Sequence, residues 1–226
     1  RPARPPARAP DPLTIPAVDA LIRAPGQHTR RGLRATTLIL LLFDTAARIQ
    51  EVLDLRIADI DTAPGRGRVT VTGKGHKTRT IPIMDKTGRH LDHYASVFHP
   101  GKAAPEALLF YTTRSGRPQP MSQDNVTFLL NKHARNARTD CPELPERIHA
   151  HQLRHARAMQ MLRAGVPLPH IKEFLGHASI TTTSIYATAD SQMVRDAIQK
   201  AAGTTPDPAP LWKGNDDLIL QLAGLT

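Results

Sequence analysis

The hydrophobic pattern of the sequence changes from a helical period to a strand period at 68–83, and this change limits the folds that the chain can adopt. Apolar residues follow a helical period over 15–47, and ATTLILLLFDTAA at 35–47 predicts a strongly buried helix. At 68–83, RVTVTGKGHKTRTIPI instead alternates β-branched residues around a Gly-Lys-Gly turn. This alternation predicts a β-hairpin with Lys74 near its tip. We therefore expect an α+β protein, mainly α-helical, with a small antiparallel β-hairpin or three-stranded sheet at one edge.

The other expected elements lie on both sides of this hairpin. RIQEVLDL at 48–55 continues the helical period, and the apolar stretch ALLFY at 107–111 is a candidate third strand. Further helices are predicted at 86–98, 122–138, 151–165, 168–176 and 192–203.

Proline-rich segments divide the chain into three parts. RPARPPARAPDP opens a linker over 1–14, because alternating proline and arginine form neither helix nor sheet. A single domain is expected over 15–203. TTPDPAP begins a second linker within 204–226, and the segment that follows it is apolar. We expect this tail to pack on its own domain or to dock on a neighbouring protomer.

The charge of the chain favours a polyanionic partner. The sequence of 226 residues carries a net charge of +10, and arginine suits planar phosphate recognition better than lysine. A basic protein that does not bind nucleic acid remains the alternative. The single cysteine, Cys141, excludes an internal disulfide and a cysteine-built zinc site. The longest apolar run, at 38–43, is far shorter than the roughly 20 residues of a membrane span, so a cytoplasmic protein is expected.

Two short stretches place charged side chains within reach of each other or of a ligand. Glu51 follows Arg48 by one helical turn in ARIQEVL, so a carboxylate can hold the guanidinium in a fixed pose. Lys74 lies between two glycines, where a lysine can move and reach. Each pattern alone is also explained by surface residues, an exposed ion pair in the first case and a solvated turn in the second.

The segment HQLRH puts cationic side chains on one face of a helix that also packs against a core. His151, Arg154 and His155 follow the spacing i, i+3 and i+4. Burying such groups is costly unless an anion meets them. A metal held by the two histidines is the weaker interpretation, because no H-E-x-x-H pattern and no third ligand are present. A structural role for His155 also remains open.

The order of these stretches resembles the catalytic domain of the tyrosine recombinases, also called the phage integrase family. An arginine is followed by a lysine on a hairpin, by LRH, and by LGHASITTTSIYA, which contains His177 and Tyr186. The resemblance covers roughly residues 15–200, and its most specific stretches are LRH, LGHASITTTSIYA and GKGHKTR. The sequence over 155–190 resembles recombinases of transposons and integrative elements more than the recombinases that resolve chromosome dimers.

The resemblance implies a metal- and ATP-independent transesterification on DNA, with no cofactor. It makes Tyr186 the nucleophile that forms a 3′-phosphotyrosine, and Lys74 the general acid for the leaving 5′-oxygen. Arg48 and Arg154 would clamp the phosphate oxygens, His151 would assist deprotonation of the tyrosine, and His177 would bind the phosphate. Glu51 would orient Arg48, and His155 would contact the catalytic residues rather than the DNA.

The expected partner is double-stranded DNA. Basic residues at helical spacing are candidate contacts to the phosphate backbone, although a solvated basic face remains possible: Arg30, Arg31, Arg34, Lys132, Arg135 and Arg138. Tyr94 and Tyr111 are expected in the core or at its rim. By the family's mechanism, four protomers assemble on DNA with exchange of C-terminal tails, and a monomer is expected in free solution.

Three other functions compete with site-specific recombination, and each predicts a different result. A type IB topoisomerase would relax one duplex with a similar pocket. A non-catalytic DNA-binding module would form no covalent complex. A metal-dependent nuclease would lose cleavage in EDTA.

Overall fold

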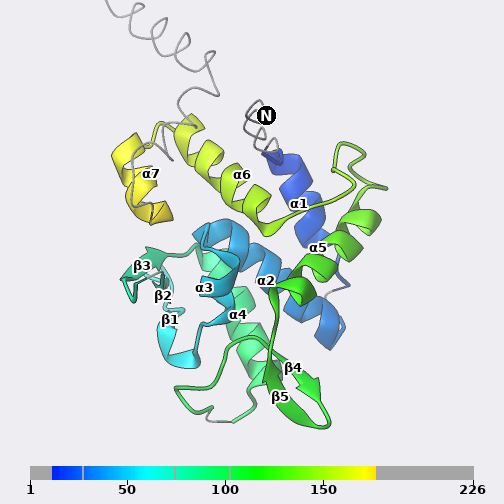
Figure 1. The fold of residues 1–226 in the computed structure, drawn as a ribbon, viewed down its shortest axis with the longest axis vertical. Coiled ribbons are helices and arrows are strands. Elements are labelled where there is room, and N and C mark those ends of the chain that lie inside the picture. Colours follow the sequence, from blue (N-terminus) through cyan, green and yellow to red (C-terminus); the bar gives the residue numbers. More distant parts are fainter. Residues whose placement is uncertain (1–11, 27, 74, 102, 177–226) are drawn as a thin grey trace, which may run out of the picture. The chain divides into compact units, whose positions relative to one another are not determined.

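The computed structural model describes residues 12–26, 28–73, 75–101 and 103–176 (Figure 1). In this part of the chain, helices predominate and the strands form two small antiparallel sheets. The elements in chain order are α1 (Ile15–Arg23), α2 (Arg30–Thr45), α3 (Ile49–Leu53), the 3₁₀ helix η1 (Ile57–Asp59), β1 (Ile60–Asp61), β2 (Arg68–Thr72), β3 (Thr78–Pro82), α4 (Asp85–Phe98), β4 (Tyr111–Arg114), β5 (Arg117–Pro120), α5 (Gln123–Ala137), α6 (Ala150–Arg163) and α7 (Leu168–Leu175). The expected α+β class with a mainly helical content is confirmed.

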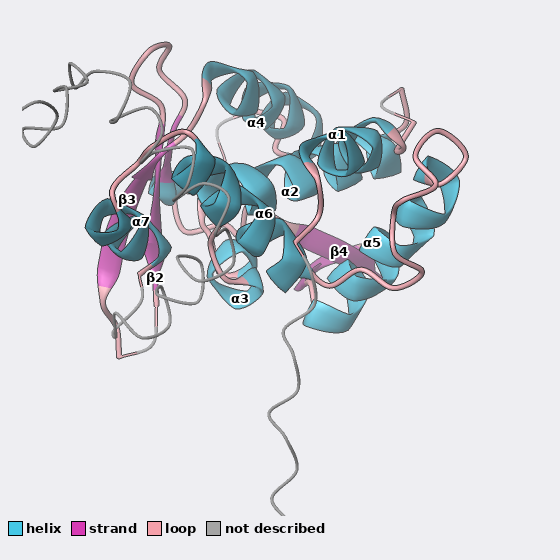
Figure 2. Cartoon of the chain, turned by 90° about the horizontal axis from the view of Figure 1, so that it is seen from above, coloured by secondary structure: helices cyan, strands magenta, loops and turns pink. Residues whose placement is uncertain are grey.

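Helix α2 forms the centre of the core. It packs against α1, α4 and α6, which lie around it in Figure 2. Leu38, Ile39 and Leu41 are fully buried, as the apolar run in the sequence predicts. A core helix of this kind is stabilised mainly by its packing, because removing apolar side chains from water contributes about 25 cal/mol per Å².

The helical pattern expected over 15–47 forms two separate helices, α1 and α2. Pro25 lies in the break, and a proline has no backbone N–H with which to continue the helix. The Thr29 hydroxyl then caps α2 by accepting a hydrogen bond from the Gly32 N–H at 3.0 Å. A Cβ at Gly32 would lie 1.9 Å from the Gly26 carbonyl oxygen, so this tight turn requires glycine.

The hairpin expected at 68–83 is confirmed as β2 and β3. Val69 is paired with Ile81, and both side chains are buried on the inner face of the sheet. The third strand is not the expected segment 107–111. Ile60 and Asp61 form β1 at the edge of β2, so the strand added to the hairpin comes from the chain before it rather than after it.

The segment 107–111 has a different role from the one expected. Its Leu109 N–H donates to the Leu55 carbonyl at 2.8 Å, and Leu109 and Phe110 are buried. Only Tyr111 enters a strand, β4, which pairs with β5 in the separate two-stranded sheet. The apolar run therefore anchors a crossing segment in the core instead of extending the first sheet.

Two tyrosines support α4, as expected for residues of the core and its rim. Tyr94 is fully buried, and its hydroxyl donates to the Leu109 carbonyl at 3.0 Å. Burial raises the pKa of Tyr94 above its usual value. The Tyr111 hydroxyl donates to the Phe98 carbonyl at 2.6 Å. Both phenols are thus used to tie the end of α4 to the crossing segment.

The limits of the expected domain are only partly described. Leu13 is buried and Thr14 caps α1, so Leu13 is the first buried residue of the part of the chain that the structure describes. The expected helix at 192–203 and the tail within 204–226 lie outside the described residues. In the described part of the chain, no helix is both long and apolar enough to cross a membrane.

Candidate active site

Arg48 lies at the junction between α2 and α3, where Glu51 holds it. Its backbone N–H donates to Glu51 Oε2 at 2.8 Å, and its Nη1 donates to Glu51 Oε1 at 2.8 Å. The short helix α3 brings the two residues together, because i and i+3 share a face. The Arg48 side chain is 46% exposed, whereas that of Glu51 is 4% exposed. Glu51 therefore orients a guanidinium that ligands from solvent can reach.

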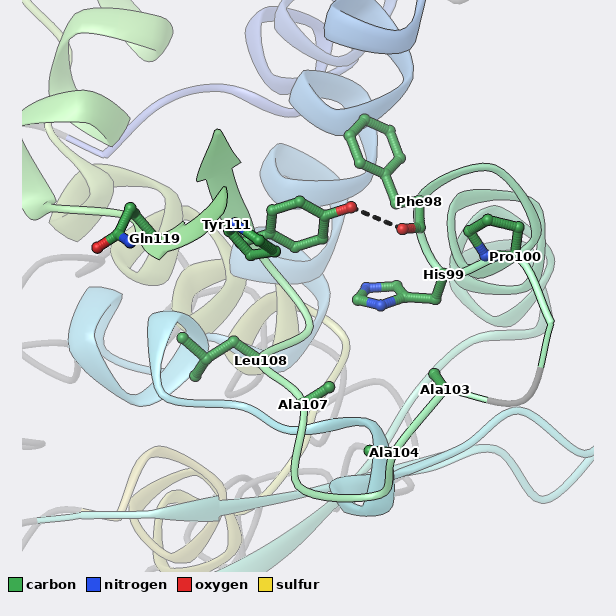
Figure 3. A pocket seen from close by; sticks show the side chains of 10 residues that line it. Phe98, His99, Pro100, Ala103, Ala104, Ala107, Leu108, Tyr111 and Gln119 are labelled. Carbon is green, nitrogen blue, oxygen red and sulfur yellow. Dashed lines mark hydrogen bonds between the residues drawn. The ribbon is translucent and has the colours of Figure 1, made fainter. Parts of the chain in front are cut away.

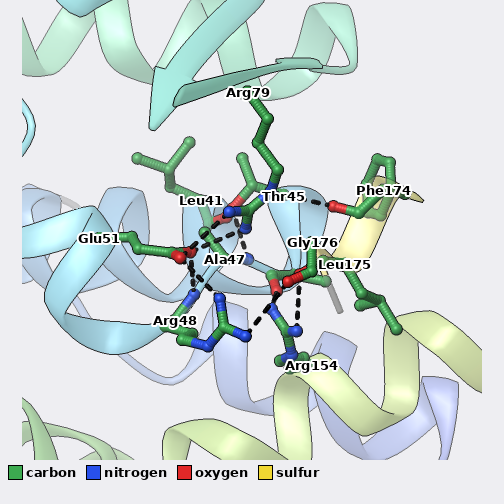
Figure 4. Close-up of polar contacts among 11 residues, drawn as sticks. Leu41, Thr45, Ala47, Arg48, Glu51, Arg79, Arg154, Phe174, Leu175 and Gly176 are labelled. Carbon is green, nitrogen blue, oxygen red and sulfur yellow. Dashed lines mark hydrogen bonds and ion pairs between the residues drawn. The ribbon is translucent and has the colours of Figure 1, made fainter. Parts of the chain in front are cut away.

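A second arginine, Arg79 on β3, also binds the Glu51 carboxylate. Its Nη1 lies 3.1 Å from Oε1 and its Nη2 lies 2.7 Å from Oε2 (Figure 4). Sequence reasoning missed this residue, although the strand pattern carries a signal for it. Arg79 precedes the buried Ile81 by two positions, so it belongs to the inward face of the hairpin.

The two arginines keep Glu51 ionised. Burial alone raises the pKa of this carboxyl group, but the hydrogen bonds from Arg79 and Arg48 outweigh burial and lower the pKa to about 2. Glu51 is thus negatively charged near neutral pH in a basic site. Its role as a residue that orients Arg48 agrees with this geometry.

Arg154 lies deeper than Arg48, on α6. Only 2% of the residue is exposed. Its Nη1 donates to the Ala46 carbonyl at 2.5 Å and its Nη2 donates to the Leu175 carbonyl at 2.7 Å. Ala46 has a left-handed conformation with φ of 47°, which turns the chain from α2 towards Arg48. Arg154 therefore joins the end of α2 to the end of α7.

His151 and His155 lie one turn apart on α6, with ring centroids 4.9 Å apart and an edge-to-face arrangement. Burial, then the positive charges of Arg154 and Arg48, hold the pKa of His151 below its usual value. Burial, then His151 and Arg154, do the same for the pKa of His155. Both imidazoles are therefore biased towards the neutral form, in which a ring nitrogen can accept a proton.

The last turn of α7 meets all three arginines. Arg79 Nε donates to the Phe174 carbonyl at 3.3 Å, Arg154 Nη2 to the Leu175 carbonyl at 2.7 Å, and Arg48 Nη2 to the Gly176 carbonyl at 3.3 Å (Figure 4). The final carbonyls of a helix have no partner within it and carry partial negative charge. The guanidinium groups thus fix the point from which the chain continues to residue 177.

The structure brings Arg48, Glu51, His151, Arg154 and His155 together, as their assignment to one site requires. The other three predicted catalytic residues are Lys74, His177 and Tyr186, which lie outside the described residues. Their assignments remain predictions.

The six basic candidates for backbone contacts differ in exposure. Arg30, Arg31, Lys132 and Arg135 are exposed. Arg34 is half-buried, and its Nη1 donates to the Tyr111 carbonyl at 2.9 Å. Arg138 is also half-buried, and its Nη1 donates to the Pro145 carbonyl at 2.7 Å. These two guanidinium groups therefore have structural contacts as well as charge.

Two pockets lie apart from the arginine cluster. One, of about 400 Å³, is basic and is lined by Thr127, Asn131, Arg135, Arg138, Glu146, Arg147 and His149. The other, also of about 400 Å³, is mainly apolar (Figure 3) and is lined by Phe98, His99, Pro100, Ala103, Ala104, Ala107, Leu108, Tyr111, Pro118 and Gln119. Within the described residues, no group of three or more His, Cys, Asp or Glu side chains is arranged to hold a metal ion.

A mainly helical fold with a basic cluster between α3, β3, α6 and α7 is what the resemblance to a recombinase catalytic domain implies, and the family comparison agrees. Residues 13–193 match the phage integrase family. The chain belongs to this family.

Curated relatives carry recombinase names. The chain is 35% identical over 191 residues to the putative integrase/recombinase y4rC of Sinorhizobium fredii, covering 84% of this chain and 55% of the relative. It is 32% identical over 189 residues to the tyrosine recombinase XerD of Halalkalibacterium halodurans, covering 84% and 60%. The chain thus spans somewhat more than half the length of these relatives.

Solved structures share the fold. The crystal structure of XerA recombinase aligns with a TM-score of 0.69 at 24% identity, covering 89% of this chain and 67% of that chain. XerH site-specific recombinase bound to a palindromic difH substrate, in a post-cleavage complex, aligns with a TM-score of 0.67 at 24% identity, covering 84% and 52%. The expected tyrosine recombinase catalytic-domain fold is confirmed.

Proposed function

We propose that this chain is the catalytic domain of a site-specific DNA recombinase of the integrase or transposase type. It would cleave and rejoin DNA strands through a 3′-phosphotyrosine intermediate. The observation that carries the proposal is the convergence of Arg48 and Arg154 on the end of α7, with His151 near enough to both that their positive charges lower its pKa. Membership of the phage integrase family and the recombinase names of the relatives support it.

In this proposal the arginines stabilise charge that develops on the phosphate. Arg48 is half-exposed and binds a non-bridging oxygen of the phosphate, while the buried Arg154 adds a second positive charge to the site. A guanidinium group stays charged at every working pH and offers paired N–H donors to an oxyanion. These groups supply the preorganised positive charge that a metal ion supplies in other phosphoryl-transfer enzymes.

The covalent steps use residues assigned by the family resemblance. The Tyr186 oxygen attacks phosphorus and forms the O–P bond as the bond to the 5′-oxygen breaks. The phenolic proton passes to neutral His151, and Lys74 protonates the departing 5′-oxygen. His177 donates to the phosphate. The phosphotyrosine conserves the bond energy, so the reverse attack by a 5′-hydroxyl rejoins a strand without ATP.

Double-stranded DNA is the proposed partner, in the bacterial cytoplasm at the nucleoid. The net charge of +10 and the exposed Arg30, Arg31, Lys132 and Arg135 favour contacts to the phosphate backbone. The related XerH recombinase was solved in complex with its difH substrate. We propose that four protomers assemble on DNA, that their C-terminal tails reach neighbouring protomers, and that the free protein is a monomer.

The test is the capture of a covalent complex on nicked suicide DNA. Duplexes from the DNA that flanks the gene, and duplexes selected by binding from a random pool, serve as candidate sites. The protein is mixed with each duplex and run on a denaturing gel with and without EDTA. We expect a protein–DNA band that persists in EDTA and disappears in Tyr186→Phe, whereas Tyr94→Phe is the matched tyrosine control. A band that survives Tyr186→Phe, or no band on any bound site, would overturn the proposal.

A further inference from the structure

The carboxylate of Glu51 is saturated by two arginines from different elements. Oε1 accepts from Arg48 Nη1 at 2.8 Å and from Arg79 Nη1 at 3.1 Å. Oε2 accepts from the Arg48 backbone N–H at 2.8 Å and from Arg79 Nη2 at 2.7 Å. A carboxylate has about four lone-pair sites, and these four bonds occupy them. Arg79 therefore contributes half of the contacts that determine how Glu51 is held.

We propose that Arg79 is a positioning residue for strand cleavage, which aims the Arg48 guanidinium through Glu51 and anchors the end of α7 through the Phe174 carbonyl. The inference rests on the proposed function and deepens it, because it names a residue of the β-hairpin on which the geometry of the phosphate clamp depends.

Without Arg79, Glu51 would keep its contacts with Arg48 but would lose its connection to the β-hairpin. Arg48 caps the short helix α3 that contains Glu51, so the contacts between these two residues would move with that helix. Arg79 Nη1 and Nη2 connect the carboxylate to β3, which is part of a paired sheet. A paired, bidentate Arg–carboxylate contact fixes direction as well as distance. The contact with Arg79 thus converts a local pair into a fixed position relative to the hairpin.

The third donor of Arg79 extends this connection to α7. Its Nε lies 3.3 Å from the Phe174 carbonyl oxygen, three positions before residue 177. Two glycines leave room for the guanidinium and its partner. A Cβ at Gly176 would lie 2.9 Å from Arg79 Cζ, and a Cβ at Gly73 would lie 3.0 Å from Glu51 Oε1. One side chain therefore joins the hairpin, α3 and the segment leading to the predicted catalytic His177.

The burial of Arg79 separates this role from direct contact with DNA. Its side chain is 17% exposed, against 46% for Arg48. Its Nη1, Nη2 and Nε groups all donate within the protein. Loss of Arg79 should therefore change the rate of cleavage by bound enzyme rather than the affinity for DNA.

The experiment measures single-turnover cleavage of nicked site DNA at saturating enzyme, the Kd for the same DNA, and thermal unfolding. The variants are Arg79→Met and Arg79→Lys. Arg68→Met is the matched control, because Arg68 lies on the neighbouring strand β2 and forms an exposed ion pair with Asp61. Arg79→Lys retains the charge and is the milder change to folding, but it loses the bidentate geometry.

We expect Arg79→Met to slow cleavage by about 100-fold, since a small misplacement of a catalytic group has this effect, while Kd changes less than about threefold. Arg79→Lys should lose about 10-fold or more, and Arg68→Met should cleave at the wild-type rate. A folded Arg79→Lys or Arg79→Met variant that cleaves like wild type, or that loses affinity instead of rate, would overturn the inference.

A double-variant cycle tests the route through Glu51. If Arg79 acts through Glu51, Glu51→Gln with Arg79→Lys should cleave no more than about threefold slower than the slower single variant, because residues that act as one unit are not additive. Rate losses that multiply would refute this route. Failure of the wild-type chain to cleave would overturn the proposed function and this inference together, whereas normal cleavage by the Arg79 variants would overturn only the inference.

Discussion

Arg154 and Leu175 connect two helices across the candidate active site, with Arg154 Nη2 donating to the Leu175 carbonyl oxygen at 2.7 Å. The carbonyl belongs to the last turn of α7, where helix carbonyls lack internal partners. The buried guanidinium thus holds the end of α7, and in the proposed function the same group also binds the phosphate. The proposed function therefore gives Arg154 a catalytic role in addition to this structural one.

This dual role predicts that Arg154→Lys separates stability from activity. A lysine keeps the charge but cannot reproduce both carbonyl contacts, with Ala46 and Leu175. We expect a loss of about 1–3 kcal/mol in the free energy of unfolding and a fall in cleavage of about 100-fold or more. Urea unfolding and single-turnover cleavage measure the two effects. If Arg154→Lys cleaves at the wild-type rate, Arg154 does not have its proposed role in binding the phosphate.

Gly176→Ala should destabilise the protein more than Gly165→Ala. Both glycines have positive φ, 65° and 81°, so both variants carry the cost of that conformation, about 1 kcal/mol. Only a Cβ at Gly176 also meets a side chain, at 2.9 Å from Arg79 Cζ, whereas nothing lies within 4 Å of one at Gly165. Urea unfolding of the pair isolates the steric part. If both variants lose the same free energy of unfolding, the Arg79 side chain shifts to make room for the Cβ at no energetic cost.

Glu51 should make the stability of the protein depend on acid pH. Its pKa is about 2 in the folded protein, against 4.5 for the ordinary group. A lowered carboxyl pKa stabilises the fold fully above pH 4.5, and this contribution is lost as the pH falls through 2. The shift corresponds to about 3 kcal/mol.

The measurement is urea unfolding of wild type and Glu51→Gln between pH 6 and pH 2. The stability advantage of the wild type should shrink as the pH falls over this range. Asp54→Asn is the control, because Asp54 is an exposed carboxylate one helical turn further along the chain. An advantage that stays constant down to pH 2 would contradict the low pKa of Glu51.

His151 should titrate below its ordinary pKa of 6.5, because burial, Arg154 and Arg48 all disfavour the imidazolium. NMR titration of the imidazole Cε1–H in the DNA-free protein measures this pKa directly. Arg48→Gln removes one of the positive charges, so it should raise the pKa, while Arg31→Gln should leave it unchanged. If the pKa of His151 does not change in Arg48→Gln, the positive charge of Arg48 does not act on His151.

Exposed basic residues should determine the salt dependence of DNA binding. If Arg135 contacts a phosphate, Arg135→Gln should weaken binding to all DNA sequences and reduce the slope of log K against log salt by about 1. Fluorescence anisotropy of labelled DNA between about 50 and 300 mM salt measures this slope. Glu146→Gln, in the same basic pocket, should not reduce the slope. An unchanged slope for Arg135→Gln would assign Arg135 to a solvated face.

The order of chemically distinct stretches in the sequence was enough to identify the family. Arg48, the Lys74 hairpin, the LRH segment and the segment from His177 to Tyr186 follow one another at recognisable spacings, and the hairpin at 68–83 and the buried helix α2 follow from local period. The Arg48–Glu51 pair was also predictable, because one helical turn brings the two residues together.

Contacts between distant segments were decided by the tertiary structure alone. Arg79 meets Glu51 from 28 positions away, and Arg154 meets Ala46 from 108 positions away. The edge strand β1 replaced the expected segment 107–111 because pairing depends on which backbone reaches the sheet edge, not on apolar composition. Local periodicity specifies which face of an element is buried, but the partners of a buried charge are known only once the elements have packed.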